Sequence, residues 1–400
     1  MALIPVDEAR ARILSFINPL APEEVQVDDA LGRALTAELI ARRTLPPWDN
    51  SAMDGYAVRA DETATTLQVI ERIFAGDRPQ HVLTAGTCAR IMTGAVLPPN
   101  AGAVVMQEKT RALEGDRVEP LELPKPGLNV RRRGEDIVEG ALLFPSGREL
   151  GIGDAGALWS QGLEQVSVHR RPRVSIASSG DELCDVGALT EGKIVDSNSP
   201  VLAALVRRAG GLPNRVGRAA DSLESVRALF QKGLDGADVL ITVAGASVGE
   251  RDFTREALQS LGVEIDFWKV AMKPGKPLAF GRKGGTIVFG LPGNPLSAMV
   301  TFEIFVRPAL RAMQGLAPLP PRLPALAAVK IGKPAGLRHF VRATWTLRDG
   351  ALWVTPLASQ SSGSLSSAAG STCLIDLPEG SSDVEIGSSC ECLPVSWVIS

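Results

Sequence analysis

The stretch VLITVAGASVGERD, residues 239–252, decides the fold class of this chain. Its first part, Val239–Val243, is an unbroken run of apolar and β-branched residues, which is typical of a strand buried on both faces. A glycine-punctuated turn follows, and a helix is expected over 253–261. A strand, a tight turn and a helix in this order indicate one half of a βαβ unit and therefore a parallel sheet.

The same alternation extends on both sides, from about residue 170 to 315. Strands are expected at 174–177, 214–216, 265–270 and 286–289, and helices at 199–209, 222–231 and 296–313. This repetition predicts a doubly wound α/β domain with a largely parallel sheet.

The flanking regions differ in pattern. Helical periodicity is found at 5–18 and around 27–35, and residues 148–168 also have helical character and could pack on the N-terminal helices. Between them, short β-rich runs separated by turns predict a small barrel or sandwich. After the proline-rich linker 318–324, further β-rich runs predict a second β domain. Those C-terminal strands are expected at 328–331, 341–347, 352–356, 372–377 and 395–399.

Composition excludes several classes of protein. A chain of 400 residues with 45% hydrophobic and 22% charged residues can bury two or three cores, at about 150 residues a domain. The net charge of -3 argues against a nucleic-acid binder. No signal-peptide pattern and no apolar run of membrane-spanning length are present, so no membrane association and a cytoplasmic location are expected. Five cysteines without a C-x-x-C and three dispersed histidines argue against disulfides and a structural zinc site.

Ligands of doubly wound sheets bind beyond the carboxyl ends of the strands. Three loops there are candidates. The loop 178–183 (SSGDEL) has carboxylates that could hold Mg²⁺ or cap the next segment. The loop 244–252 (AGASVGERD) could hold an anion, or Asp252 could be an N-cap. The loop 290–295 (GLPGNP) could cradle phosphate or form a rigid turn.

Charged clusters supply further candidates. Four of the ten lysines lie at 269–283, two of them on the stiff turn KPGKP, 273–277, which suits phosphate or an oxyanion. The run RRRGED, 131–136, is either a solvated charge run or a site with its own counter-ions. The serine-rich segment 359–371 is either a flexible loop or a polar ligand loop.

Taken together, nine segments resemble the MoeA and gephyrin E-domain family, in the order found in that family. They are PPWDNSAMDGYAV, RIMTGA, AVVMQE, NVRRRGEDI, SSGDEL, VDSN, ASVGERD, KPGKP and LPGNPLSA, between residues 46 and 298. The resemblance implies a discontinuous helical domain at 1–45 plus 141–168 and an inserted β domain at 46–140. It further implies a molybdopterin-binding-like α/β domain at 169–316 and a C-terminal β-barrel at 317–400.

The activity that the resemblance implies is that of a molybdopterin molybdenumtransferase. This Mg²⁺-dependent transferase inserts molybdate into adenylylated molybdopterin and releases AMP. Family members are homodimers, with an active site between the α/β domain of one subunit and the β domain of the other. A molybdopterin adenylyltransferase and apo-molybdoenzymes are the implied transient partners.

Site residues follow from the same resemblance. The implied catalytic residues are Asp54, Arg131, Asp136, Lys273 and Lys276. Metal ligation is implied for Glu182 and Asp196, which would also contact substrate. The other implied substrate-binding residues are Asp221, Ser247, Gly249, Asp252, Lys269, Pro292, Gly293 and Ser362, the last beside Gly363.

One segment departs from the family pattern. The family has two glycines before S-V-G, whereas this chain has Ala244-Gly245-Ala246. A methyl group at Ala244 restricts the backbone and could crowd a ligand. Three alternatives to the molybdenumtransferase follow: an adenylyltransferase built on the related α/β domain, a non-enzymatic scaffold, and a paralogue that binds the cofactor without completing it.

Overall fold

The computed structural model describes residues 3–243 and 253–398. The chain forms two compact units. The first unit comprises Met1–Thr36, Gly147–Gly151 and Gln165–Ser400, and the second comprises Ala37–Ser146 and Ile152–Glu164.

The first unit is built around a sheet with the strand order β16-β13-β17-β21-β20-β18. Its first four strands are parallel, and β20 is antiparallel to both of its neighbours. Every residue of β17 is buried, which explains its apolar composition. The strands are β13 (Arg173–Ser179), β16 (Leu212–Ala219), β17 (Val239–Val243), β18 (Glu264–Lys269), β20 (Pro277–Lys283) and β21 (Thr286–Leu291).

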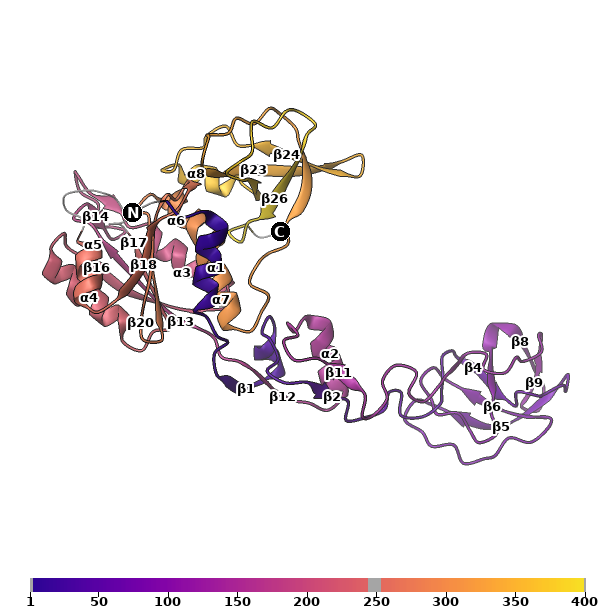
Figure 1. The fold of residues 1–400 in the computed structure, drawn as a ribbon. Helices are drawn as coiled ribbons and strands as arrows, with labels where there is room; N and C mark the ends of the chain where they lie inside the picture. The colour runs from indigo at the N-terminus through magenta and orange to yellow at the C-terminus, as the bar shows by residue number, and fades with distance from the viewer. Residues whose placement is uncertain (1–2, 244–252, 399–400) are drawn as a thin grey trace. The chain divides into compact units, whose positions relative to one another are not determined.

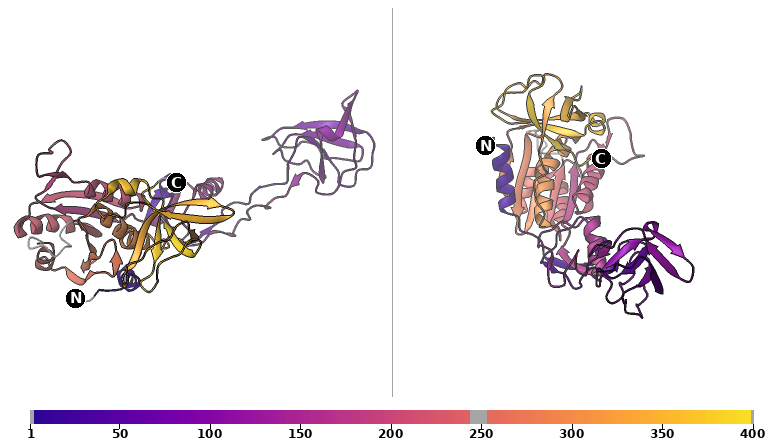
Figure 2. Two further views of the ribbon diagram at one scale, coloured as in Figure 1. Left: turned by 90° about the horizontal axis from the view of Figure 1, so that it is seen from above. Right: turned by 90° about the vertical axis from the view of Figure 1, so that its right-hand side faces the viewer.

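Helices cover both faces of this sheet (Figure 1). One hydrophobic core joins the sheet to α1 (Val6–Ser15), α3 (Asn198–Arg208), α6 (Pro295–Thr301) and α7 (Arg307–Met313). The other core joins it to α4 (Leu223–Leu234) and α5 (Thr254–Ser260). Figure 2 shows the indigo helix α1 alongside the central layers. The doubly wound α/β fold is therefore confirmed.

The helix expected over 296–313 is present but not uniform. A π-helical turn, η3 (Phe302–Val306), separates α6 from α7. Glu303 lies in this turn, where it is buried, accepts a hydrogen bond from the Ser396 hydroxyl and pairs with Arg307. The turn thereby directs a charged side chain into the packed interior of the helix.

The C-terminal strands close into a barrel, because β23 pairs with β24 on one side and β25 on the other. The barrel strands are β22 (Leu323–Ala327), β23 (Arg338–Arg348), β24 (Ala351–Pro356), β25 (Cys373–Leu377) and β26 (Ser389–Pro394), with the short helix α8 (Leu365–Ala369) between β24 and β25. The expected strand at 395–399 is wrong: the last strand ends at Pro394.

One short strand ties the barrel to the α/β domain. β19 (Met272–Lys273) pairs in parallel with β23, so that Lys273 lies opposite His339. The turn carrying two lysines is thereby held against a barrel strand. The two segments are far apart in sequence, and no local pattern connects them.

Residues that flank these domains form smaller elements. β1 (Pro22–Gln26) pairs with β12 (Gln165–His169), and η1 (Val27–Ala30) is a single 3-10 turn. β14 (Leu183–Cys184) pairs with β15 (Ile194–Val195). The helical character expected throughout 148–168 is wrong at its end, because β12 occupies 165–169 as an extended strand.

The second unit contains a β sheet of strand order β7-β4-β6-β5-β9-β8. Small apolar cores lie on its two faces. The strands are β4 (Gly55–Val58), β5 (Leu67–Ile73), β6 (Thr87–Ile91), β7 (Ala103–Met106), β8 (Thr110–Leu113) and β9 (Arg117–Pro120), with the 3-10 turn η2 (Gln107–Lys109). The unit also holds β2 (Leu39–Ile40), β3 (Asn50–Ser51), β10 (Val130–Arg131), β11 (Leu142–Phe144) and helix α2 (Ile152–Ser160).

Helix length bears on membrane association. Within residues 3–243 and 253–398, none of the helices has the length and apolar character needed to span a bilayer.

Candidate functional site

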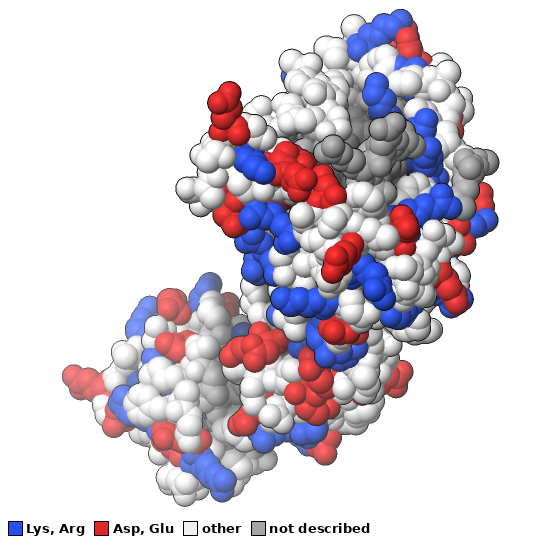
Figure 3. Space-filling model, turned by 90° about the vertical axis from the view of Figure 1, so that its left-hand side faces the viewer, with Lys and Arg blue, Asp and Glu red and all other residues white. Residues whose placement is uncertain are grey.

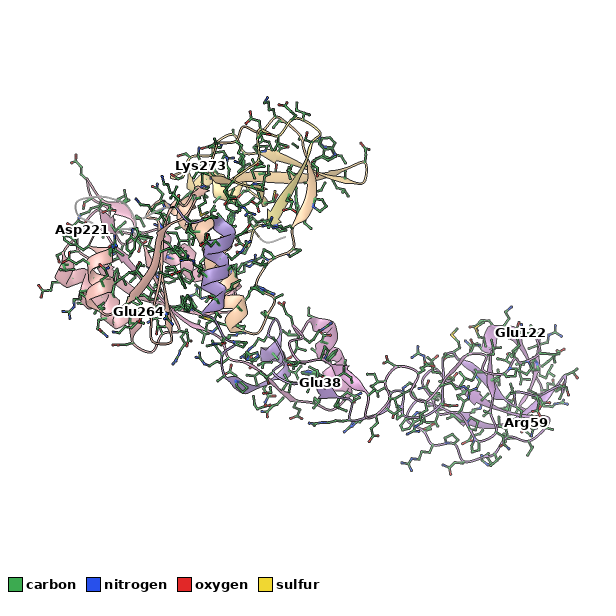
Figure 4. All side chains as sticks on the ribbon, viewed as in Figure 1. Glu38, Arg59, Glu122, Asp221, Glu264 and Lys273 are labelled. Atoms are coloured by element: carbon green, nitrogen blue, oxygen red, sulfur yellow. The ribbon has the colours of Figure 1, made fainter. Side chains whose placement is uncertain are left out.

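A cavity of about 500 Å³ lies beyond the carboxyl ends of β13, β17 and β21, where a doubly wound sheet binds its ligands. We call it the strand-end cavity. Several sequence-predicted residues line it together. They are Glu182, Asp196, Asp221, Pro292 and Gly293. Figure 4 shows Asp221 and Lys273 toward this end of the sheet and Glu264 at the opposite end.

The loop after β13 depends on a glycine. Gly180 has a φ of +151°, and a Cβ at this position would lie 2.5 Å from the Glu182 carboxylate. Only glycine therefore lets this carboxylate fold back over the turn. Glu182 is itself exposed, and its oxygens remain accessible at the edge of the cavity.

Asp196 is buried and takes part in a local hydrogen-bond network. Its Oδ2 accepts hydrogen bonds from the hydroxyls of Ser178 at 3.1 Å and Ser199 at 2.6 Å. Its Oδ1 accepts the backbone N–H of Ser199, near the start of α3, at 3.0 Å. The side chain therefore acts as a capping group and joins the loop after β13 to α3.

A second pair of carboxylates locks two neighbouring loops together. The N–H of Asp221 donates to Asp181 Oδ1 at 3.1 Å, and the N–H of Asp181 donates to Asp221 Oδ2 at 3.4 Å. Asp221 follows β16 and Asp181 follows β13, which are adjacent strands. This reciprocal arrangement was not predicted from the sequence, although the position of each acid directly after a strand was a usable signal.

The loop after β21 connects the strand-end cavity to the C-terminal barrel. Asn198 donates to the carbonyl of Gly293 at 2.7 Å. Asn294 donates to the Ser362 hydroxyl at 3.1 Å, and the Leu296 N–H donates to the Ser362 carbonyl at 3.2 Å. The serine-rich segment thus contacts the functional loops through Ser362, and the ligand-loop interpretation gains support over a purely flexible one.

A second cavity of about 500 Å³ lies between the KPGKP turn and the barrel strand β23. We call it the cationic cavity. It shares Pro277 with the strand-end cavity, so the two are neighbours. The charged or titratable side chains that line it are Lys273, Lys276, His339 and Arg342, and its hydroxyls come from Ser297, Ser361 and Ser362.

Arg342 is fully buried in the wall of the cationic cavity. Its Nη2 donates to the carbonyls of Ser359 at 2.9 Å and Ser361 at 3.2 Å. In the part of the chain that the structure describes, its Nε and Nη1 have no hydrogen-bond partner. Burial without a counter-ion lowers the pKa of this guanidinium to about 10. An unpaired buried cation beside a cavity is suited to an anionic ligand.

His339 lies on the same wall and is also buried, with its Nδ1 lacking a partner among the described residues. Burial, together with the positive charges of Lys273, Lys333 and Arg342, lowers the pKa of its imidazole to about 4. The imidazole is therefore neutral near pH 7. Arg342 and His339 were both missed from the sequence, where the only signal was the unusual density of basic residues in strand 338–342 (RHFVR).

Lys269 was expected beside the other two lysines. It ends β18, and its carbonyl accepts the Ile4 N–H at 3.3 Å. Among the described lining residues, it belongs to neither cavity. Its role in binding stays a prediction.

The second unit positions the remaining candidates separately. Asp54, in the turn before β4, accepts hydrogen bonds from the N–H and the hydroxyl of Thr93, each at 2.7 Å, and these bonds lower the pKa of its carboxyl. Arg131 lies on β10 opposite Asn50, and Asp136 is in the exposed loop that follows. The neighbouring Arg132 pairs with Asp49 at 2.6 Å, so part of the arginine run has its own counter-ion.

Some predicted residues cannot be placed. Ser247, Gly249 and Asp252, and the Ala244 departure, lie outside the described residues. Within the described ranges, no three His, Cys, Asp or Glu side chains gather closely enough to hold a metal by themselves. On the face shown in Figure 3, acidic and basic side chains are interspersed, with one compact acidic group.

Three family models match the chain in succession. They are the MoeA N-terminal region (domain I and II) at residues 4–162, the probable molybdopterin binding domain at 175–312, and the MoeA C-terminal region (domain IV) at 324–395. Fold and site therefore define a multidomain protein built around an α/β domain of the molybdopterin-binding type.

Individual relatives match the whole chain. A molybdopterin molybdenumtransferase of Haemophilus influenzae is 34% identical, covering 99% of this chain and 100% of the relative. One from Nostoc sp. is 42% identical over 74% of this chain and 70% of its own. The crystal structure of the molybdopterin biosynthesis MoeA protein from Pyrococcus horikoshii OT3 has a TM-score of 0.84 at 29% identity, covering 98% and 99% of the two chains. The chain belongs to the MoeA family.

Proposed function

We propose that this protein is a molybdopterin molybdenumtransferase, a transferase of molybdenum cofactor biosynthesis. It would transfer molybdenum from molybdate to adenylylated molybdopterin and release AMP. The names of its relatives support this activity. The structural observation that carries it is the pair of adjacent cavities that share Pro277, one beyond the strand ends and one lined by unpaired cations.

The two cavities suit the two substrates. The strand-end cavity is the larger opening onto polar loops and has the position at which doubly wound domains bind phosphorylated ligands. Adenylylated molybdopterin would bind there, with Pro292, Gly293, Asp221 and the undescribed loop residues Ser247, Gly249 and Asp252 around it.

Molybdate is assigned to the cationic cavity. A tetrahedral dianion between Lys273, Lys276 and Arg342 would neutralise charges that have no partner in the described chain. The Nε and Nη1 groups of Arg342 would supply charge-assisted hydrogen bonds, which are stronger than neutral ones. Ser362 contacts the loop between both cavities and would place the oxyanion near the pterin.

A Mg²⁺ ion fits the strand-end cavity, which holds Glu182 and Asp196. Mg²⁺ is usually held by one or two protein carboxylates together with substrate phosphates and water, so the absence of a larger described cluster is compatible with it. Glu182 has accessible oxygens, and Asp196 Oδ1 accepts only one described hydrogen bond. The ion would supply positive charge at the pyrophosphate oxygens.

The protein's own groups would act by charge and position. Lys273, Lys276 and, less directly, Lys269 would stabilise the anions that develop when the pyrophosphate bond breaks. The lowered pKa of Asp54 keeps its carboxylate ionised at neutral pH, so it would act as a hydrogen-bond acceptor that orients water or substrate rather than as a base tuned to pH 7. Arg131 and Asp136 would contact substrate from the second unit.

The remaining assignments belong to the same proposal. The protein would work in the cytoplasm as a homodimer, in which the second unit of one copy completes the site of another. It would receive substrate from a molybdopterin adenylyltransferase and pass cofactor to apo-molybdoenzymes.

Kinetics of matched variants test this function. Purified protein would be given adenylylated molybdopterin, molybdate and Mg²⁺, and AMP release would be followed. Asp54→Asn should lower the rate by about 10²-fold, as expected for loss of a positioned catalytic group. Asp61→Asn, a surface acid paired with Arg59 in the same unit, is the control and should leave it unchanged. Equal rates for the two variants would remove Asp54 from the mechanism, and no AMP from wild type would refute the activity.

A further inference from the structure

His339 has a geometry that the proposed activity leaves unexplained. Its backbone lies opposite Lys273, in the parallel pairing of β19 and β23. Its side chain is buried in the wall of the cationic cavity, and its Nδ1 has no hydrogen-bond partner in the described chain. A buried polar atom normally has a partner, so this nitrogen is an open position for a ligand atom.

The charges around His339 are all positive. Lys273 faces it from β19, Lys333 from the segment before β23, and Arg342 from β23 itself. On β25 its neighbour is the apolar Leu377, and Asp376 of that strand is bound by Arg338. No carboxylate acts on His339 within the described chain, so protonation in the empty cavity is opposed from every side.

A bound dianion would reverse this balance. It would bring two negative charges against three positive neighbours, and a protonated imidazole could donate a hydrogen bond from Nδ1 to an anion oxygen. A tetrahedral monoanion of similar size would supply half of that charge. The stabilisation of the protonated imidazole thus depends on the charge of the ligand.

We infer that His339 binds a proton when a tetrahedral dianion enters the cationic cavity, and that this coupling makes the cavity prefer dianions to monoanions. The inference rests on the proposed function only in assigning the oxyanion to this cavity. It makes His339 a specificity-determining residue of the oxyanion site.

Calorimetry of the full-length protein tests this coupling. Molybdate would be titrated at several pH values between 6 and 8, in buffers of different ionisation enthalpy, so that proton uptake is measured directly. Wild type should take up roughly one proton per molybdate at the acid end, and its affinity should fall by up to ~10-fold per pH unit as pH rises. Perrhenate, a tetrahedral monoanion, should bind more weakly and take up fewer protons.

Two variants complete the experiment. His339→Gln should bind molybdate without proton uptake, with an affinity independent of pH and with less discrimination against perrhenate. His81→Gln is the control, because His81 is exposed and lies in the second unit; it should behave as wild type. The wild-type measurement stands by itself if the His339 variant does not fold.

The outcomes separate the two proposals. Molybdate binding that is abolished by Arg342→Met but releases or takes up no proton in wild type would overturn the role of His339 and leave the oxyanion assignment intact. Molybdate binding that is unchanged in Arg342→Met, or absent from wild type, would overturn both.

Discussion

Replacing Arg342 with Met should cost the anion-free protein little stability, although Arg342 is a fully buried charged residue. The same change at Arg338, four residues earlier on β23, should be severe. Arg338 donates to both oxygens of the buried Asp376, at 2.6 and 2.7 Å, and to Asp7 at 2.8 Å. These contacts raise its pKa, whereas burial lowers that of Arg342.

The magnitudes follow from these environments. Lowering the Arg342 pKa from 12.5 to about 10 corresponds to about 3 kcal/mol of unfavourable desolvation in the folded state. Its two hydrogen bonds to Ser359 and Ser361 contribute about 1–1.5 kcal/mol each. These contributions nearly cancel, so Arg342→Met should change the free energy of unfolding by less than about 1 kcal/mol. Arg338→Met leaves Asp376 buried without its main partner and should cost about 3–5 kcal/mol.

Urea unfolding in a buffer free of sulfate and phosphate measures the difference. The fluorescence of Trp345 and Trp353, on the paired barrel strands β23 and β24, reports on this part of the chain. Added molybdate should raise the unfolding midpoint of wild type but not of Arg342→Met. A loss of stability in Arg342→Met as large as that in Arg338→Met would refute the view that Arg342 is unpaired for the sake of a ligand.

Three further predictions follow from the site. Lys276→Ala should lower molybdate-dependent AMP release by about 10²-fold through loss of an anion-stabilising charge, whereas Lys283→Ala, at the far end of β20, should have no effect, as steady-state rates would show. Because the pKa of His339 is about 4 when folded and 6.5 when unfolded, the unfolded state binds the extra proton, so wild type should lose about 3 kcal/mol relative to His339→Gln as pH falls from 6.5 to 4 in urea titrations; equal acid sensitivity would contradict this. Gly180→Ala should cost about 1–2 kcal/mol and weaken substrate binding, because its Cβ meets the Glu182 carboxylate; a fully stable variant with unchanged affinity would show that the turn is not constrained.

Much of the α/β domain could be predicted because its signals are local. Val239–Val243 is an apolar run because it is buried on both faces as β17, and the helices on either side begin and end within a few residues of their expected limits. The strand β20 was missed because glycine and proline at its start favoured a turn. The expected strand at 395–399 failed because hydrophobic residues there pack without joining the barrel ladder. The predicted domain limits stay predictions.

The site was only partly predictable for a related reason. Lys273 and Lys276 stand out by composition, and Glu182 and Asp221 by their place after strands. Arg342 and His339 join them only because β19 pairs with β23, a tertiary contact between distant segments. Asp196 was predicted as a ligand, and the sequence could not show that its carboxylate is already engaged by two serines.

The central claim is that molybdenum insertion and AMP release are one coupled activity of this chain. The most direct measurement is a single-turnover reaction with adenylylated molybdopterin and Mg²⁺, with and without molybdate, in which released AMP and pterin-bound molybdenum are quantified in the same sample. The account predicts molybdate-dependent AMP release in equal amount to the molybdenum bound. AMP released equally without molybdate, or without any molybdenum retained on the pterin, would contradict it.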